Sequence, residues 1–155
     1  MKKIIAGAAF GIAALSIATS AAAQVSVEDA IKFRQAGYAF MSWNMGKIKA
    51  QVIDGQPYNQ DQVAAAANAI AAIANSGMGA LYPAGSDTGT GFRATKVKPE
   101  FFQNMPDVGQ LAGNFNTAAN ELAAAAATGD QGAIRAAFGK VGETCKACHD
   151  KYRAK

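Results

Sequence analysis

The chain has 155 residues, of which 50% are hydrophobic, and it carries 15 Lys and Arg against 11 Asp and Glu. This length suits one domain with a single hydrophobic core, and the small, evenly spread positive charge does not indicate a nucleic-acid-binding protein. The two cysteines are three residues apart, so a disulfide between them would close a tiny loop and restrain the unfolded chain very little.

The N-terminal segment has the pattern of a secretory signal peptide. Two lysines precede an uncharged, apolar run over residues 4–17, and three alanines follow at 21–23. Small residues before the cleavage point suit signal peptidase, whereas the apolar run is short for a membrane span. The sequence therefore predicts a cleaved signal peptide over 1–23 and a mature domain over 24–155 in the periplasm. An uncleaved membrane anchor is the alternative.

The first helix is predicted to begin after Ser26, an N-cap candidate, and to end by 54–57, where a Gly and a Pro occur. Spacings of three and four residues place one stripe along it, which includes an arginine and a tyrosine among apolar side chains. The stripe consists of Val27, Ile31, Arg34, Tyr38, Met41, Met45, Ile48 and Val52. A second, alanine-rich helix is predicted to start near Asn59 or Asp61 and to end at 75–77.

The connection over 77–98 is long and rich in Gly, Ser, Thr and Pro, which makes it a candidate wall of a ligand site. A third helix is predicted from Pro99 to 128–129, with Pro106 expected to kink or split it. A fourth begins with Asp130 as N-cap and continues almost to the C-terminus. Four amphipathic helices without strand periodicity predict an all-α fold, an antiparallel four-helix bundle.

The fourth helix carries Cys145-Lys146-Ala147-Cys148-His149, the attachment pattern for covalently bound haem c. Residues three and four apart share one face of a helix, so both thiols and the imidazole project to the same side. A zinc site is less favoured because the chain offers only these three ligands. A thioredoxin-like redox pair is expected at a helix N-terminus beside a strand, and this pair lies in the last helix.

Three stretches of the sequence resemble the cytochromes c′ of bacterial periplasms, the class II c-type cytochromes. They are Glu28–Gln35, Lys98–Phe102, and the segment from Arg135 through the haem motif to Arg153. The resemblance covers essentially all of 24–155. It implies a homodimer of four-helix bundles, each with one haem, five-coordinate iron held by His149, and an apolar distal pocket that admits nitric oxide or carbon monoxide.

The resemblance also implies roles for individual residues. Arg34 and Gln35 match residues that lie against the haem and its propionates, and Thr95 is a looser match in the long connection. Arg153 matches the basic residue beside the proximal imidazole, and Tyr38 matches the distal residue.

Low-spin relatives carry a methionine at the position of Tyr38, which leaves a second interpretation open. Met41 and Met45 share its stripe, so a His/Met-ligated electron carrier is the alternative to an open iron site. Core packing is the favoured role for both methionines.

Two further expectations concern the first helix. Arg34 lies on a buried stripe, so it is expected to need a buried anionic partner, which a propionate would supply. Phe33 and Phe40 are expected to pack in the core or in the dimer.

With no second histidine or acid–base pair to act on a substrate, the chain is predicted to bind gases and exchange electrons with a periplasmic redox partner, not to be an enzyme.

Overall fold

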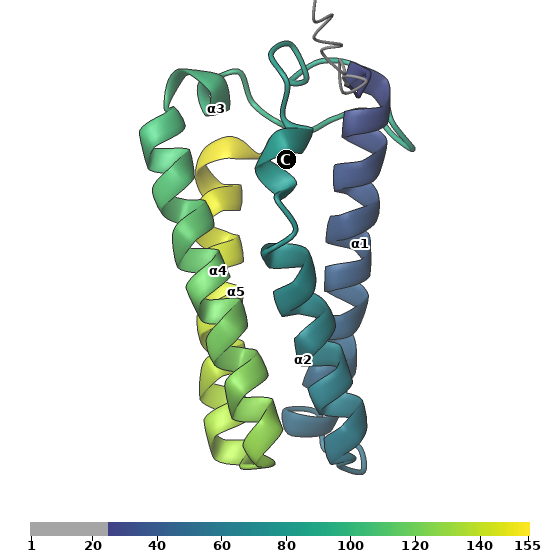
Figure 1. Cartoon of the computed structure of the whole chain (residues 1–155), viewed down its shortest axis with the longest axis vertical. Helices are drawn as coiled ribbons and strands as arrows, with labels where there is room; N and C mark the ends of the chain where they lie inside the picture. Colours follow the sequence, from purple (N-terminus) through teal and green to yellow (C-terminus); the bar gives the residue numbers. More distant parts are fainter. Residues whose placement is uncertain (1–24) are drawn as a thin grey trace, which may run out of the picture.

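A computed structural model describes residues 25–155, and the predicted signal peptide lies outside these residues. The described part is helical, and its β-structure consists of isolated bridges. Its elements are α1 (Val27–Val52), α2 (Gln60–Ala74), the 3₁₀-helix η1 (Met78–Leu81), α3 (Glu100–Gln103), α4 (Met105–Thr128) and α5 (Gln131–Tyr152). The four long helices alternate in direction, with α1 beside α2 and α4 beside α5 (Figure 1). The predicted antiparallel four-helix bundle is confirmed.

Side-chain caps fix where the long helices begin. The Ser26 side chain accepts a hydrogen bond from the Asp29 N–H at 3.0 Å, and the Asn59 side chain caps α2 in the same way. Asp130 accepts from two N–H groups at the start of α5. Gly129 ends α4 with a positive φ of 75°, a conformation that favours glycine.

The predicted interruption near Pro106 is a complete break between α3 and α4. Asn104 separates the two helices, and Pro106 is the second residue of α4. A proline is tolerated there because the N–H groups of the first turn have no partner within the helix. The short α3 can therefore turn across the end of the bundle (Figure 1).

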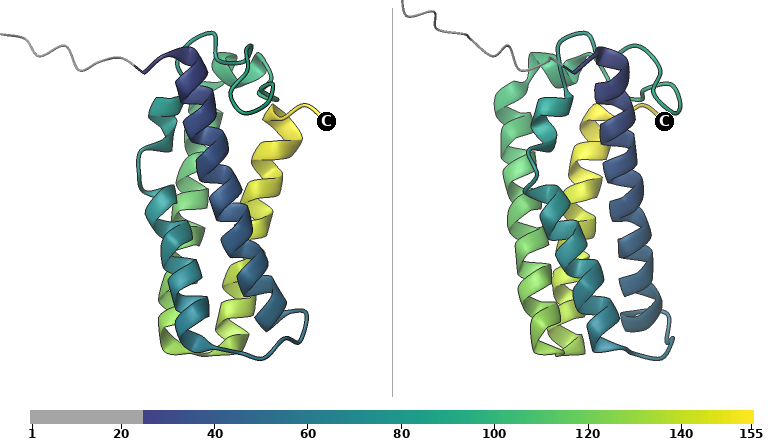
Figure 2. Two further views of the ribbon diagram at one scale, coloured as in Figure 1. Left: turned by 90° about the vertical axis from the view of Figure 1, so that its right-hand side faces the viewer. Right: turned by 45° about the vertical axis from the view of Figure 1, so that its right-hand side comes forward.

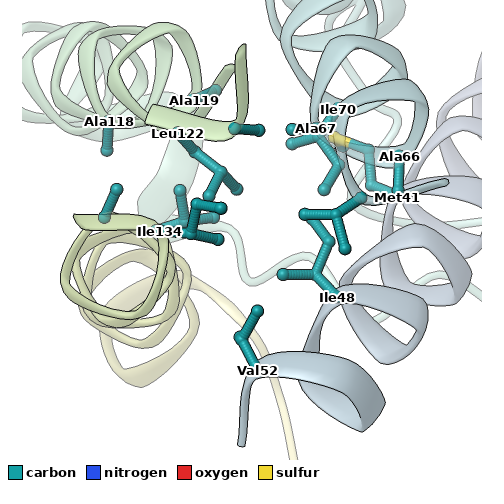
Figure 3. Packing of buried hydrophobic residues seen from close by; sticks show 14 of the residues in the cluster. Met41, Ile48, Val52, Ala66, Ala67, Ile70, Ala118, Ala119, Leu122 and Ile134 are labelled. Carbon is teal, nitrogen blue, oxygen red and sulfur yellow. The ribbon is translucent and has the colours of Figure 1, made fainter. Parts of the chain in front are cut away.

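The core consists of two separate clusters. The larger one fills the body of the bundle, where Ile48, Ile70, Leu122 and Ile134 are fully buried (Figure 3). The smaller cluster lies around Phe101, Val108 and Tyr152 at the end where α5 finishes. Alanines on α2 and α4 complete the larger cluster and permit close approach of the helices. They are Ala66, Ala67, Ala74, Ala118, Ala119 and Ala126.

The connection between η1 and α3 folds over the end of the bundle at which the C-terminus lies (Figure 2). Backbone hydrogen bonds join it to the last residues: the Lys98 N–H donates to the Tyr152 carbonyl at 3.0 Å, and the Ala154 N–H donates to the Lys96 carbonyl at 2.8 Å. None of the helices in residues 25–155 is both long and apolar enough to cross a membrane.

Candidate haem site

Cys145, Cys148 and His149 occupy the last two turns of α5. Both cysteines are free and half-buried. Burial raises the pKa of each thiol, so both are protonated at neutral pH and lack the thiolate of a redox-active pair or a zinc ligand. Within residues 25–155, no group of three or more His, Cys, Asp and Glu side chains is placed to hold a metal ion. The zinc and thioredoxin-like interpretations therefore lose support.

The two thiols lie where the two core clusters meet. Cys145 packs against the larger cluster and Cys148 against the smaller one. Burial, with a further contribution from Arg153, lowers the pKa of His149. This favours the neutral imidazole, which is the form that coordinates iron. Two thiols and one neutral imidazole on one helix face fit a haem attached by two thioether bonds and held by one axial ligand.

Tyr38, the predicted distal residue, lies on α1 and is hydrogen-bonded to Tyr82, which packs against the same cluster as Cys148. Burial raises the pKa of its phenol, and both Cys145 and Cys148 contribute to that shift. Its hydroxyl lies 3.1 Å from the hydroxyl of Tyr82, whose pKa is also raised by burial. Tyr38 is therefore neutral at physiological pH and belongs to a pair of phenols. The second phenol was not singled out from the sequence, although it lies in the connection that was predicted to line a ligand site.

Arg34 is only 3% exposed, and its partners are neutral oxygen atoms. One terminal nitrogen donates to the Leu81 carbonyl and the Ser86 hydroxyl, and the other donates to the Ser86 carbonyl and the Thr95 hydroxyl. Within residues 25–155 no carboxylate forms an ion pair with Arg34, and the binding of a propionate by this residue stays a prediction. Because these bonds use all four terminal N–H groups, only the Nε–H remains for any propionate. Burial lowers the pKa of Arg34.

Gln35 and Thr95 belong to the same contact between α1 and the connection. The Gln35 side chain donates to the Arg93 carbonyl at 2.8 Å and accepts from the Phe92 N–H at 2.9 Å. Gly91 lies so close to α1 that a Cβ there would be 2.7 Å from the Lys32 nitrogen. The structure thus brings Arg34, Gln35 and Thr95 together as anchors of the connection.

Arg153 directly follows α5, and its N–H donates to the His149 carbonyl at 3.1 Å. Its charge helps to lower the pKa of His149, and its role beside the proximal ligand stays a prediction.

The two methionines considered as iron ligands belong to the bundle core. Met41 is 6% exposed and lies among core side chains such as Ala66 and Ile70 (Figure 3). Met45 packs against the same cluster. Their surroundings are those of core residues, whereas Tyr38 is hydrogen-bonded to Tyr82 beside the cluster that includes Cys148.

The comparisons with known proteins agree with this geometry. The family described as Cytochrome C′ matches residues 29–153. The chain is 60% identical to cytochrome c′ of Allochromatium vinosum over 156 residues, which cover 100% of both chains. A solved cytochrome c′ with an unusual ligand-controlled dimer dissociation is 62% identical, with a TM-score of 0.81 over 84% of this chain and 98% of that one.

A mutant of cytochrome c′ from Alcaligenes xylosoxidans, solved as its nitric oxide complex, is 32% identical, with a TM-score of 0.75 over 84% of this chain and 98% of that one. Together with the Cys-x-x-Cys-His motif on α5, these matches show that the chain is a monohaem c-type cytochrome and belongs to the cytochrome c′ family.

Proposed function

We propose that this cytochrome keeps its iron five-coordinate, with His149 as the axial ligand, and binds nitric oxide or carbon monoxide at the open position. One observation carries the proposal: Tyr38 is hydrogen-bonded to Tyr82, which packs against the same cluster as Cys148, whereas Met41 lies in the bundle core. A neutral phenol is a poor iron ligand, and the raised pKa of Tyr38 keeps it neutral.

Different residues of the protein would then act on the proximal and the distal face of the haem. When bound, the haem supplies an iron that cycles between ferric and ferrous states and takes a diatomic ligand. On the proximal side, the lowered pKa of His149 favours the form with a free nitrogen lone pair. On the distal side, the Tyr38 ring restricts entry, and its hydroxyl can donate to a bound ligand. Arg34, Gln35 and Thr95 hold the connection in place, and the Nε–H of Arg34 would be the donor left for a propionate.

We propose that two copies associate through α1. Three aromatic side chains on this helix are half-exposed: Phe33 at 56%, Phe40 at 50% and Trp43 at 57%. The rings of Phe40 and Trp43 are 5.4 Å apart, and the Lys47 ammonium lies 4.3 Å from the Trp43 ring. Exposed aromatic residues gathered on one helix are typical of a protein interface.

The dimer and the gas site use the same helix, because Tyr38 lies between Phe33 and Phe40 in the sequence of α1. A ligand that displaces Tyr38 therefore acts on the helix that forms the interface. The relative with ligand-controlled dimer dissociation supports such a coupling here.

Export to the periplasm completes the proposal, with electrons exchanged there with a redox partner. It rests on the signal-peptide pattern over residues 1–23, and mass measurement of the periplasmic protein should give a chain that begins at Gln24. Retention of residues 1–23 in a membrane fraction would contradict this proposal. No catalytic turnover is assigned, since the chain's one histidine belongs to the haem motif.

The experiment that tests the gas site compares Tyr38→Ala with Met41→Leu. The first should accelerate carbon monoxide binding to the ferrous protein, because the ring that restricts entry is gone. The second should leave the absorption spectrum unchanged. A low-spin spectrum that becomes high-spin in Met41→Leu would establish the His/Met-ligated electron carrier instead.

A further inference from the structure

Three side chains contact Tyr82, which lies in the connection between η1 and α3. Its ring stacks on Phe101, with centroids 4.6 Å apart and planes inclined by 21°. The guanidinium carbon of Arg34 lies 4.5 Å from the centre of the same ring. Its hydroxyl donates to the hydroxyl of Tyr38 at 3.1 Å. Tyr82 is thus fixed by packing and charge, and one polar atom remains to contact the distal residue.

Tyr38 has fewer contacts than Tyr82 to fix the position of its side chain. Its side chain is 42% exposed, and within residues 25–155 the Tyr82 hydroxyl is the sole hydrogen-bond partner of its own hydroxyl. A phenol on a helix can rotate about two side-chain torsions unless its end is held. The position of the Tyr38 ring therefore depends on Tyr82.

We propose that Tyr82 is a positioning residue that holds Tyr38 over the open iron position, and that Arg34 acts through Tyr82. This inference rests on the proposed function, in which Tyr38 restricts entry of the gas. Arg34 holds the Tyr82 ring directly and also binds the carbonyl of Leu81, the preceding residue, at 3.1 Å. The buried guanidinium of Arg34 thus contacts Tyr82, and Tyr82 in turn contacts Tyr38.

The hydrogen bond between the two phenols adds a second role. The pair carries two hydroxyl protons and its mutual bond uses one, so one proton is left for another acceptor. A bound diatomic ligand with an acceptor atom could take the free proton, so Tyr82 both holds the ring and orients its donor.

The test uses the haem-loaded protein and five variants: Tyr82→Phe, Tyr38→Phe, the double variant of these two, Tyr38→Ala and Tyr58→Phe. The carbon monoxide association rate of the ferrous protein is measured for each. Tyr82→Phe keeps the stacked ring and removes only the hydroxyl, so it should raise the rate about fivefold, the change that corresponds to losing one neutral hydrogen bond. Tyr38→Phe should give a similar increase, and the double variant no further increase, because one bond is lost in all three.

Tyr58→Phe is the matched control. The Tyr58 hydroxyl lies 3.4 Å from the Gly129 carbonyl, at the opposite end of the bundle, so its loss should leave the rate unchanged. Equilibrium unfolding of the first three variants gives a second readout: the losses from Tyr82→Phe and Tyr38→Phe should be non-additive. A wild-type rate in Tyr82→Phe, with a faster rate in Tyr38→Ala, would overturn the role of Tyr82 alone. A wild-type rate in Tyr38→Ala would overturn the proposed gas site as well.

Discussion

Replacing Arg34 with methionine tests whether this buried cation anchors the long connection. The change removes four hydrogen bonds from a charged donor and one contact with an aromatic ring. Hydrogen bonds from charged groups contribute about 1.5–3 kcal/mol each, but they do not add fully. Removing the guanidinium also removes the cost of burying its charge. The expected net loss is therefore about 3–5 kcal/mol, a large part of the stability of a single domain.

The assay is chemical unfolding of the haem-loaded protein, followed by far-ultraviolet circular dichroism. Hydrogen exchange should also accelerate at the Gly91 and Thr95 amides, whose backbone bonds lie within the connection. Arg34→Lys should show a smaller loss, because a lysine keeps the charge but lacks the planar set of donors.

Arg135→Met is the matched control for this experiment. Arg135 is exposed and makes one hydrogen bond, from its Nε–H to the Val52 carbonyl at 2.8 Å; because water can replace this bond, the expected loss is about 1 kcal/mol, less than for a buried charged donor. A loss below about 1 kcal/mol in Arg34→Met, with exchange at the connection unchanged, would refute the anchoring role.

Three further changes test other parts of the account. Replacing Cys145 and Cys148 together with alanine should abolish covalent haem, measured by retention after acid–organic extraction; haem that resists extraction would contradict the thioether assignment. Trp43→Lys should shift the dimer toward monomer in sedimentation, because a charge enters the exposed aromatic patch; an unchanged dimer would exclude that face. Hydrogen bonds from Tyr152 and Lys151 hold the pKa of Asp107 in the folded protein below its usual 3.8. The ionised carboxylate therefore stabilises the fold fully above pH 3.8, and this contribution is lost as the pH falls through the pKa of the folded state. Asp107→Asn should accordingly cost stability in urea at pH 6 and less at pH 2; an equal cost at both would contradict this.

Local sequence patterns were sufficient for the helices. Ser26 and Asp130 were identified as caps from residue type, and both accept the expected backbone hydrogen bonds. Pro106 was expected to kink or split the third helix, and the chain does break there. The haem motif was also predictable from the sequence, because it depends only on the spacing of two cysteines and a histidine within two helical turns.

Contacts between distant segments were not predictable in the same way. Tyr82 lies 44 residues from Tyr38, and no periodic pattern in the connection marks it. For Arg34 the sequence suggested a buried anionic partner such as a propionate, which stays a prediction; the carbonyl and hydroxyl oxygens of the folded connection that bind its guanidinium could not be foreseen. Trp43 was missed because it lies outside the buried stripe of α1, although an aromatic residue on an exposed helix face is itself a sign of an interface.

Whether the iron has an open sixth position is visible in the absorption spectrum. The spectra of the purified ferric and ferrous protein should be recorded before and after addition of carbon monoxide. We expect high-spin, five-coordinate iron in both oxidation states, and conversion of the ferrous form to a low-spin complex by the gas. A low-spin spectrum in both states that carbon monoxide leaves unchanged would contradict it.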